Sequence, residues 1–355
     1  MALFDPHPVF DRVFAPDALS LGLVLPIGRA GQVQPDPAEQ LALAVLADEI
    51  GLSALWGRDV PLNSPAYSDP IEHLEPWVHL GALAAVTRQI ALVTGAIVSP
   101  LRHPLHVAKA ALSVDHLSGG RMILGLGSGD RPAEFQTFGL DVAQAAERFR
   151  QHWTTIEGLL SGDGRVDASG ETANPAAAIL PRPAQGRIPM LAVGSAGQTI
   201  GWVARNANGW ATYYRPLDKQ RDRYAMWAGA IDKAALPGRP VFACAMALEL
   251  LEDPDAPAQP LGLGLRVGRN GLVDELLALR ALGAGHVMFN IAGQARSAQA
   301  VLRELTAEVA PRLSERFQHS GAHSRPWRRR PPRAADARRR RRRSEPLWSI
   351  HLNSQ

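Results

Sequence analysis

Short apolar runs and longer segments of helical period follow one another eight times between residues 21 and 313. The apolar runs, which we predict to be strands, are 21–27, 53–56, 90–98, 122–127, 189–193, 209–213, 240–250 and 286–291. The segments of helical period are 37–50, 76–87, 104–117, 143–160, 199–206, 218–235, 272–282 and 298–313. Strict alternation indicates a parallel sheet. Eight units fit a single (β/α)8 barrel, a TIM barrel, better than the alternative, an open doubly wound sheet.

The pattern also divides the chain into parts. We predict a barrel domain over residues 1–317, with a polar, Pro- and Gly-rich excursion at 161–187 and an irregular segment at 252–269. Residues 318–355 carry 11 Arg and two acids, a net charge of +9, which leaves −5 for the other 317 residues. We expect this Arg-rich tail to be disordered, and its charge is no reason to expect that the barrel binds nucleic acid.

Composition narrows the class of protein further. A single cysteine, Cys244, excludes an internal disulfide and a multi-cysteine metal site, and it suits a reducing cytoplasm. No stretch approaches 18 uninterrupted apolar residues, and the first residues lack the pattern of a secretory signal. We therefore expect a cytoplasmic protein with neither a membrane partner nor a metal site.

Two blocks of sequence carry a family resemblance. RHPLHVAK at 102–109, DHLSGGRMILGLGSG at 115–129 and EFQTFG at 134–139 closely resemble the bacterial-luciferase-like flavin-dependent oxidoreductases. IPMLAVGSAGQTIGWVARNANGWATY at 188–213 looks like the second signature of that family. The GRDVP, GDRP and EDPDAP segments resemble one uncharacterised subgroup. The resemblance covers about residues 20–313 and implies a barrel that uses FMN.

The third predicted strand holds the first candidate cofactor residues, Thr94, Gly95 and Ala96. A glycine inside a strand marks a bulge or a close approach of backbone. The resemblance implies more: it places a non-proline cis peptide, here Gly95–Ala96, beneath the isoalloxazine ring, where small residues leave room for a flat ring.

A small-residue turn, Gly194-Ser195-Ala196-Gly197, joins a predicted strand to a predicted helix. Amide groups at a helix start favour an anion, and small residues let a phosphate approach the backbone. The alternative is a plain helix cap made by Ser195. With the resemblance, we predict that this turn binds the flavin phosphate.

The segment 125–129 (GLGSG) is a poor dinucleotide loop, because Asp130 stands where the last glycine of that motif would be. The residues alone indicate a tight turn at the barrel mouth. The resemblance places Ser128 beside the ribityl phosphate, although luciferase itself has an arginine at the matching place.

No acid–base dyad is evident, so the catalytic residues stay unknown. Arg58 follows the second strand, where it can face the flavin or an anionic substrate, or pair with Asp59 at the rim. His103 precedes a helix-opening proline, which suits a cap or packing residue as well as an acid–base group. His103 and His106 lack a third metal ligand nearby.

Three further residues are candidates for a substrate pocket. Trp56 ends the second strand and can line an apolar pocket or fill the barrel. Tyr213 ends the sixth strand with Tyr214 and Arg215, which suits a substrate wall or rim packing. Asn290 closes the eighth strand and can reach the flavin or substrate through its amide.

Together the pattern and the resemblance predict an FMN-dependent oxidoreductase. The expected reaction is monooxygenation of a small organic substrate with reduced FMN and oxygen. The alternatives are a deazaflavin-dependent hydride-transfer enzyme on the same barrel and a flavin-binding protein without turnover. The expected partners are a small-molecule substrate, a separate flavin reductase and a second copy of the chain.

Overall fold

The computed structural model describes residues 3–29, 31–63, 71–161 and 178–315. They belong to one compact unit, Met1–Phe317. Most of the predicted excursion and the whole predicted tail, residues 162–177 and 318–355, lie outside the described residues.

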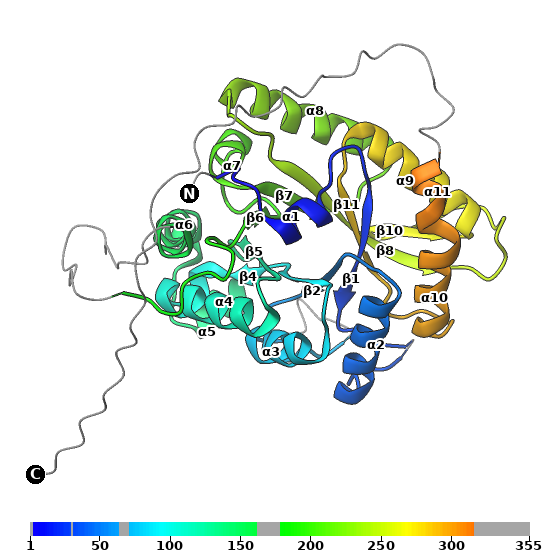
Figure 1. Ribbon diagram of the computed structural model, residues 1–355, viewed down its shortest axis with the longest axis horizontal. Coiled ribbons are helices and arrows are strands. Elements are labelled where there is room, and N and C mark those ends of the chain that lie inside the picture. The colour runs from blue at the N-terminus through cyan, green and yellow to red at the C-terminus, as the bar shows by residue number, and fades with distance from the viewer. Residues whose placement is uncertain (1–2, 30, 64–70, 162–177, 316–355) are drawn as a thin grey trace, which may run out of the picture. The chain divides into compact units, whose positions relative to one another are not determined.

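Eight parallel strands form a closed barrel at the centre of the molecule (Figure 1). Around the barrel they are β1 (Ser20–Leu25), β2 (Ala54–Gly57), β3 (Ala91–Thr94), β5 (Met122–Gly127), β6 (Met190–Val193), β7 (Gly209–Tyr213), β8 (Val241–Leu250) and β11 (His286–Asn290). β11 pairs in parallel with both β8 and β1, and these pairings close the ring. The predicted (β/α)8 barrel is confirmed, and the open doubly wound sheet is excluded.

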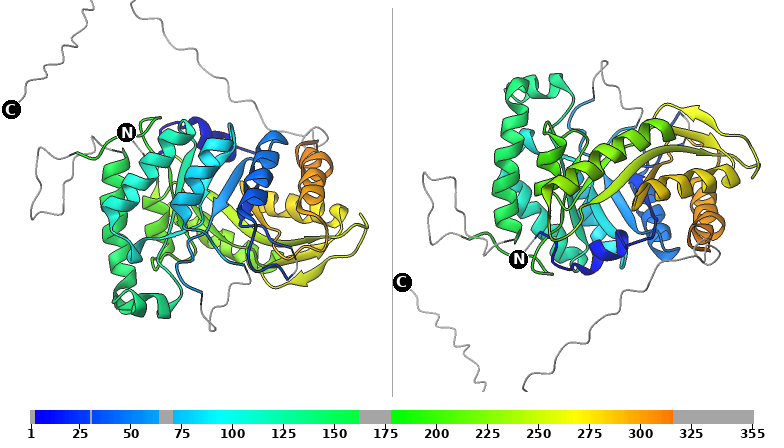
Figure 2. Two further views of the ribbon diagram at one scale, coloured as in Figure 1. Left: turned by 90° about the horizontal axis from the view of Figure 1, so that it is seen from below. Right: turned by 90° about the horizontal axis from the view of Figure 1, so that it is seen from above.

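Helices surround the barrel on all sides (Figures 1 and 2). The helices that cover the strands are α2 (Pro37–Glu49), α3 (Pro76–Val86), α4 (Pro104–Ser118), α6 (Ala145–Ser161), α7 (Ile200–Asn206), α8 (Leu217–Ala234), α9 (Arg269–Leu282) and α10 (Ala298–Glu304). α10 continues through a π-helical turn (Leu305–Val309) into α11 (Ala310–Glu315). Each predicted helical segment is therefore present, although α9 begins three residues earlier than expected.

The helices begin where the sequence supplies caps. Asp36 accepts a hydrogen bond from the N–H of Ala38, and Glu75 accepts two from the first turn of α3. Proline stands at the first position of α2, α3 and α4, where its missing N–H costs nothing. α4 ends at Gly119, whose φ of 70° suits a left-handed cap.

The predicted strand 90–98 is not continuous. The Gly95–Ala96 peptide bond is cis, and β3 stops at Thr94 before a second short strand, β4 (Ile97–Val98), pairs with the upper half of β5. The bulge between β3 and β4 lies at the C-terminal mouth of the barrel.

The segment 252–269, expected to be irregular, contains a hairpin that projects from the barrel (Figure 2). Its strands are β9 (Gln259–Leu261) and β10 (Gly264–Val267), and the turn passes through Gly262 at φ 47°. β10 pairs in parallel with the far half of the ten-residue β8. Pro260 lies on the edge strand, where its missing donor is tolerated, so prolines did not exclude strands here.

The other elements absent from the prediction are short. α1 (Pro8–Val13) lies across the N-terminal end of the barrel, and α5 (Pro132–Thr137) follows β5 at the opposite end. A 3₁₀ turn follows β4 (Ser99–Leu101), and another precedes α6 (Val142–Gln144).

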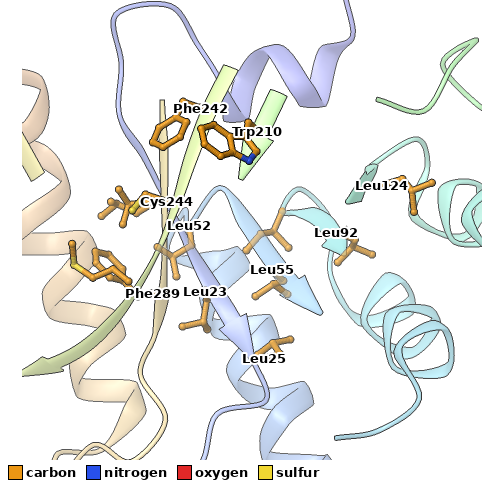
Figure 3. Close-up of a cluster of buried hydrophobic side chains, with 14 of the residues drawn as sticks. Leu23, Leu25, Leu52, Leu55, Leu92, Leu124, Trp210, Phe242, Cys244 and Phe289 are labelled. Atoms are coloured by element: carbon orange, nitrogen blue, oxygen red, sulfur yellow. The ribbon is translucent and has the colours of Figure 1, made fainter. Parts of the chain in front are cut away.

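Two apolar layers hold the barrel together. The outer layer lies between strands and helices, and Figure 3 shows part of it, with Leu23, Leu55 and Leu92 side by side on β1, β2 and β3. The inner layer fills the barrel. It consists of Val24, Ala54, Trp56, Ala91, Val93, Ile123, Leu191, Ala211, Ala243 and Met288, with Val9, Phe10 and Val13 of α1 and its C-cap Phe14 below. In the described residues the N-terminal end of the barrel is thus plugged, and the barrel opens at its C-terminal mouth, where the sites of such barrels lie.

Candidate functional site

Glycines and alanines line the mouth between β3, β5 and β6. A Cβ added to Gly127 would lie 3.2 Å from the Cβ of Ala96, and one added to Gly125 would lie 2.0 Å from the carbonyl oxygen of Thr94. A Cβ added to Gly95 would lie 2.7 Å from Cε3 of Trp56. The backbones therefore approach too closely for larger residues, and this wall of the mouth has no protruding side chain.

Thr94 supports this wall from within. Its Oγ1 donates to the carbonyl of Gly125 at 2.7 Å and accepts from the N–H of Gly125 at 2.8 Å. The hydroxyl is fully buried and already used. Thr94 therefore fixes the strands that carry Gly95 and Gly125, rather than offering its own hydroxyl to a ligand.

Two turns that we predicted separately meet above β5 and β6. A Cβ added to Gly197 would lie 3.5 Å from the Cβ of Ser128. Three residues of the second turn have a left-handed backbone, with φ of 67° at Gly194, 50° at Ala196 and 63° at Gly197. A backbone of this kind forms a concave nest of amide groups, which suits an anion.

The structure corrects the role of Ser195 as a helix cap. The N-cap of α7 is Thr199, whose side chain accepts from the N–H of Trp202. The Oγ of Ser195 instead accepts from the N–H of Gly197 at 3.3 Å within the turn. The helix is only seven residues long and starts five residues after Ser195, so the amides that could face an anion belong to the turn and not to the helix start.

Sequence reasoning missed Arg148 on α6, a helix that packs against the second turn two positions earlier. There, Ala146 would contact a Cβ at Gly197, and the backbone carbonyl of Ala146 accepts from Gln198 at 2.7 Å. The Nε of Arg148 is buried and, among the described residues, has no hydrogen-bond partner. A buried guanidinium donor without a partner is a natural contact for an anion.

His152 stands one turn further along α6, on the same face as Arg148. Its Nδ1 lies 2.9 Å from the carbonyl oxygen of Ser99, just after β4. Burial lowers the pKa of His152, and the charge of Arg148 lowers it further against the opposing hydrogen bond of Ser99. Arg148 therefore lies beside His152, near the turn that follows β4.

The predicted pair of Arg58 with Asp59 is wrong. Asp59 is paired with Arg102, whose Nε and Nη2 donate to its two carboxylate oxygens at 2.9 and 2.8 Å. Asp59 also accepts from the N–H of Val98 at 3.0 Å, so it ties the β2 end to β4. Burial would lower the pKa of Arg102, but Asp59 and then Glu75 outweigh it and raise that pKa.

Successive side chains of a strand point alternately into and out of the barrel, and Ala54 and Trp56 of β2 point inward. By the same alternation, Arg58 belongs to the inner side, at the mouth. Its Nη1 lies 3.4 Å from Nε2 of His73.

His103 is exposed and is the N-cap of α4. Its Nδ1 accepts a hydrogen bond from the N–H of Leu105 at 3.3 Å. The geometry thus agrees with the capping alternative for His103, and its catalytic role stays a prediction.

The three predicted pocket residues occupy different depths. Trp56 is buried in the barrel interior, directly beneath Gly95. Tyr213 and Asn290 follow Ala211 and Met288 in alternation, so they belong to the inner side at the rim. Tyr213 is 50% exposed, whereas its neighbour Tyr214 is buried. Trp56 is therefore barrel filling below the mouth, and Tyr213 and Asn290 remain candidates for its wall.

A second residue that sequence reasoning missed is Glu134 on α5, beside the β5 end. The side chain is buried, and its Oε1 has no hydrogen-bond partner in the described ranges, although Nη1 of Arg131 lies 3.9 Å away. Burial raises the pKa of Glu134 despite the opposing charge of Arg131. Glu134 is therefore a buried carboxyl group near the mouth whose surroundings favour its protonated form.

The described residues offer neither a metal site nor a membrane span. No group of three or more His, Cys, Asp or Glu side chains in them is arranged to hold a metal ion. None of their helices combines the length and the apolar character needed to cross a membrane.

A barrel closed below by α1, with a small-residue wall and two glycine-rich turns at its mouth, defines the class of (β/α)8 proteins whose sites lie at the C-terminal ends of the strands. The family model for luciferase-like monooxygenases matches residues 19–259. The chain therefore belongs to the luciferase-like monooxygenase family, as the sequence motifs indicated.

Curated relatives include both monooxygenases and dehydrogenases. The chain is 34% identical over 209 residues to the 4-hydroxyprotoasukamycin monooxygenase of Streptomyces nodosus subsp. asukaensis, which covers 57% of this chain and 54% of that protein. It is 30% identical over 201 residues to an F420-dependent glucose-6-phosphate dehydrogenase of Microbacterium testaceum, covering 52% and 55%. The chain thus spans about half the length of these relatives.

Solved structures share the fold at lower identity. The oxygenating constituent of the 3,6-diketocamphane monooxygenase of Pseudomonas putida, in complex with FMN, matches with a TM-score of 0.61 and 17% identity. An F420-dependent secondary alcohol dehydrogenase matches with a TM-score of 0.66 and 15% identity. Each match covers 83% of this chain and 98% of the other.

Proposed function

We propose that the chain is an FMN-dependent monooxygenase that acts on a small organic substrate. The observation that carries the proposal is the meeting of two features at one mouth: the small-residue wall at Gly95 and Ala96, and the paired turns at Ser128 and Gly197. Such a wall and such turns suit a flat ring that ends in a phosphate, and the buried Nε of Arg148, without a partner in the described structure, lies on the helix that packs against the second turn.

The residues fit such a cofactor on the evidence of their own packing. A Cβ would clash with Trp56 at Gly95 and with the carbonyl of Thr94 at Gly125, and it would be crowded by Ala96 at Gly127, so the ring would lie against backbone and the methyl group of Ala96. Gly194, Ser195, Ala196 and Gly197 would hold the phosphate with backbone amides and the hydroxyl of Ser195. Arg148 would add a charge-assisted hydrogen bond.

When bound and reduced, FMN supplies the electrons that activate oxygen, one atom of which enters the substrate while the other leaves as water. The chain's own residues bind, orient and shield. The plugged barrel below and the apolar inner layer exclude water from beneath the ring. Glu134, whose pKa is raised by burial, is the side chain near the mouth suited to hold a proton.

The substrate would enter from the open side of the mouth. Tyr213 offers an aromatic face at the rim, Asn290 an amide and Arg58 a guanidinium. Asn290 already accepts from the N–H of Ala292 through Oδ1, which leaves its NH₂ group to donate. This set suits a small organic molecule with one polar or anionic group. A separate flavin reductase would supply the reduced cofactor.

A second candidate is deazaflavin-dependent hydride transfer. F420-dependent dehydrogenases stand among both the curated relatives and the similar structures. The same wall and turns would accommodate a deazaflavin, because it shares the flat ring and a phosphate. A flavin-binding protein without turnover is the remaining alternative.

Labelled oxygen separates these candidates. We would supply FMN, a flavin reductase and ¹⁸O₂ to the purified chain, with a panel of aldehydes, alkanes and sulfonates, and analyse products by mass spectrometry. The proposal predicts one ¹⁸O atom in a product. Oxidation of an alcohol with F420, without ¹⁸O incorporation, would establish the second candidate instead, and no turnover with either cofactor would leave a binding protein.

A further inference from the structure

A chain of buried hydrogen bonds runs along the barrel axis beneath the mouth. The indole N–H of Trp56 donates to Nε2 of His286 at 3.0 Å. Nδ1 of His286 lies 2.6 Å from Oγ of Ser20, and this hydroxyl donates to the carbonyl of Val13 at 2.6 Å. The chain therefore connects α1, at the closed end, with the side chain that supports Gly95.

The direction of every hydrogen bond in this chain is fixed. An indole N–H can only donate, so Nε2 of His286 must accept and the proton must sit on Nδ1. Nδ1–H then donates to Ser20, whose own hydrogen goes to Val13. His286 is fully buried, and desolvation lowers its pKa to about 3, so the ring stays neutral and the arrangement is kept at ordinary pH.

The ring of His286 has no room to move. A Cβ added to Gly22 would lie 2.6 Å from Nε2, and Phe14 meets the ring edge-on at 5.7 Å between centroids. The indole of Trp56 lies nearly coplanar with the imidazole, at 24° between planes and 5.7 Å between centroids, which is the side-by-side arrangement of its hydrogen bond to Nε2. His286 is therefore confined by Gly22, Phe14 and Trp56, and it holds Trp56 through the hydrogen bond.

The edge of the Trp56 indole that is remote from His286 lies against Gly95 at the mouth. A Cβ added to Gly95 would lie 2.7 Å from Cε3 of Trp56, so no slack separates the indole from the bulge. We propose that His286 is a positioning residue for the cofactor: through Trp56 it sets the height and tilt of the Gly95–Ala96 backbone against which the flavin ring rests. The inference rests on the proposed flavin site and deepens it.

Substitutions at His286 separate positioning from mere stability. His286→Phe keeps a ring but removes the acceptor, so we expect about a tenfold loss of FMN affinity and a shifted absorption band of the bound flavin. His286→Gln restores an acceptor near Nε2, so it should recover most of that loss. Phe10→Leu is the matched control, because Phe10 is buried in the same inner layer near the plugged end and takes no part in the hydrogen-bond chain. It should lower stability without changing FMN affinity.

The experiment uses the full chain and two readouts. In protein labelled with ¹⁵N-tryptophan and free of cofactor, the indole resonance of Trp56, assigned by its loss in Trp56→Phe, should move in His286→Phe and return toward its place in His286→Gln. FMN titration by flavin fluorescence then gives the affinity of each variant. Should His286→Phe not fold, Ser20→Ala removes only the partner of Nδ1, and we expect a smaller shift of the same resonance with about threefold weaker FMN binding.

The possible failures can be told apart. If the unchanged chain has no affinity for FMN, the proposed function falls and this inference falls with it. If the unchanged chain binds FMN, and His286→Phe or Ser20→Ala binds it with equal affinity and an identical spectrum, the inference alone is overturned. Equal losses in His286→Phe and Phe10→Leu, without recovery in His286→Gln, would also overturn it.

Discussion

Replacing Arg148 by methionine should change stability and cofactor affinity in opposite directions. The Nε of Arg148 is buried without a partner in the described structure, and an unsatisfied buried donor costs roughly 1–3 kcal/mol. Methionine keeps most of the apolar stem and removes the donor. We therefore expect the cofactor-free variant to unfold with a free energy equal to or about 1 kcal/mol above that of the parent, measured by urea denaturation.

The same change should weaken FMN binding. A charge-assisted hydrogen bond contributes about 1.5–3 kcal/mol, which corresponds to roughly 10- to 150-fold in Kd. Riboflavin, which lacks the phosphate, should bind both proteins alike. Arg221→Met is the matched control, because Arg221 is exposed on α8, a helix that carries none of the proposed phosphate contacts. Unchanged FMN affinity in Arg148→Met, or an equal loss for riboflavin, would refute the assignment of Arg148 to the phosphate.

Three more substitutions test neighbouring parts of the account. Gly95→Val should destabilise the chain by about 1–3 kcal/mol and weaken FMN binding more than tenfold, because the new side chain meets Trp56. Gly81→Ala is the control in the same FMN titration. A Cβ at Gly81 would have nothing within 4 Å, so FMN affinity should stay unchanged. Ser195→Ala should weaken FMN about 10- to 150-fold but not riboflavin, since its hydroxyl hydrogen is lost while the amides remain. Burial lowers the pKa of His7 to about 4, so between pH 6.5 and 4 the unfolded chain binds a proton that the folded chain does not. The free energy of unfolding therefore falls as the pH drops through this range, by roughly 3 kcal/mol in all. His7→Asn keeps the cap on Phe10 and should flatten that dependence in thermal melts between pH 7 and 4.5.

The order of strands and helices in the barrel could be predicted, because hydrophobic periodicity and the residues that begin or end an element are local properties of the sequence. Every strand of the ring has an apolar run, and each helix is bounded by a cap, a proline or a glycine. The hairpin β9–β10 could not, because its strands are short, rich in proline and stabilised only by pairing with the far half of β8. α1 was missed for a similar reason, since six residues give too short a period and its apolar face is defined only by the barrel that it plugs.

The parts of the site that consist of backbone turns could be predicted from the sequence. The parts that depend on contacts between side chains far apart in the sequence could not. The turns at Ser128 and Ser195 follow strands, so the fold class alone brings them to one mouth. Arg148 resembles any exposed helical arginine in sequence, and only the packing of α6 against the turns distinguishes it. Asp59 stands next to Arg58 in the chain, yet it pairs with Arg102, 43 positions away, because the end of β2 directs its carboxylate toward β4.

We propose that the mouth binds a flavin through both its ring and its phosphate. An equilibrium titration of the full chain with FMN, riboflavin and F420, each oxidised and reduced, tests this binding. We expect FMN to bind more tightly than riboflavin by the contribution of the phosphate contacts, and more tightly than F420. Tighter binding of F420 would move the chain to the hydride-transfer candidate, whereas equal affinity for FMN and riboflavin, or no binding of any of the three, would contradict the site.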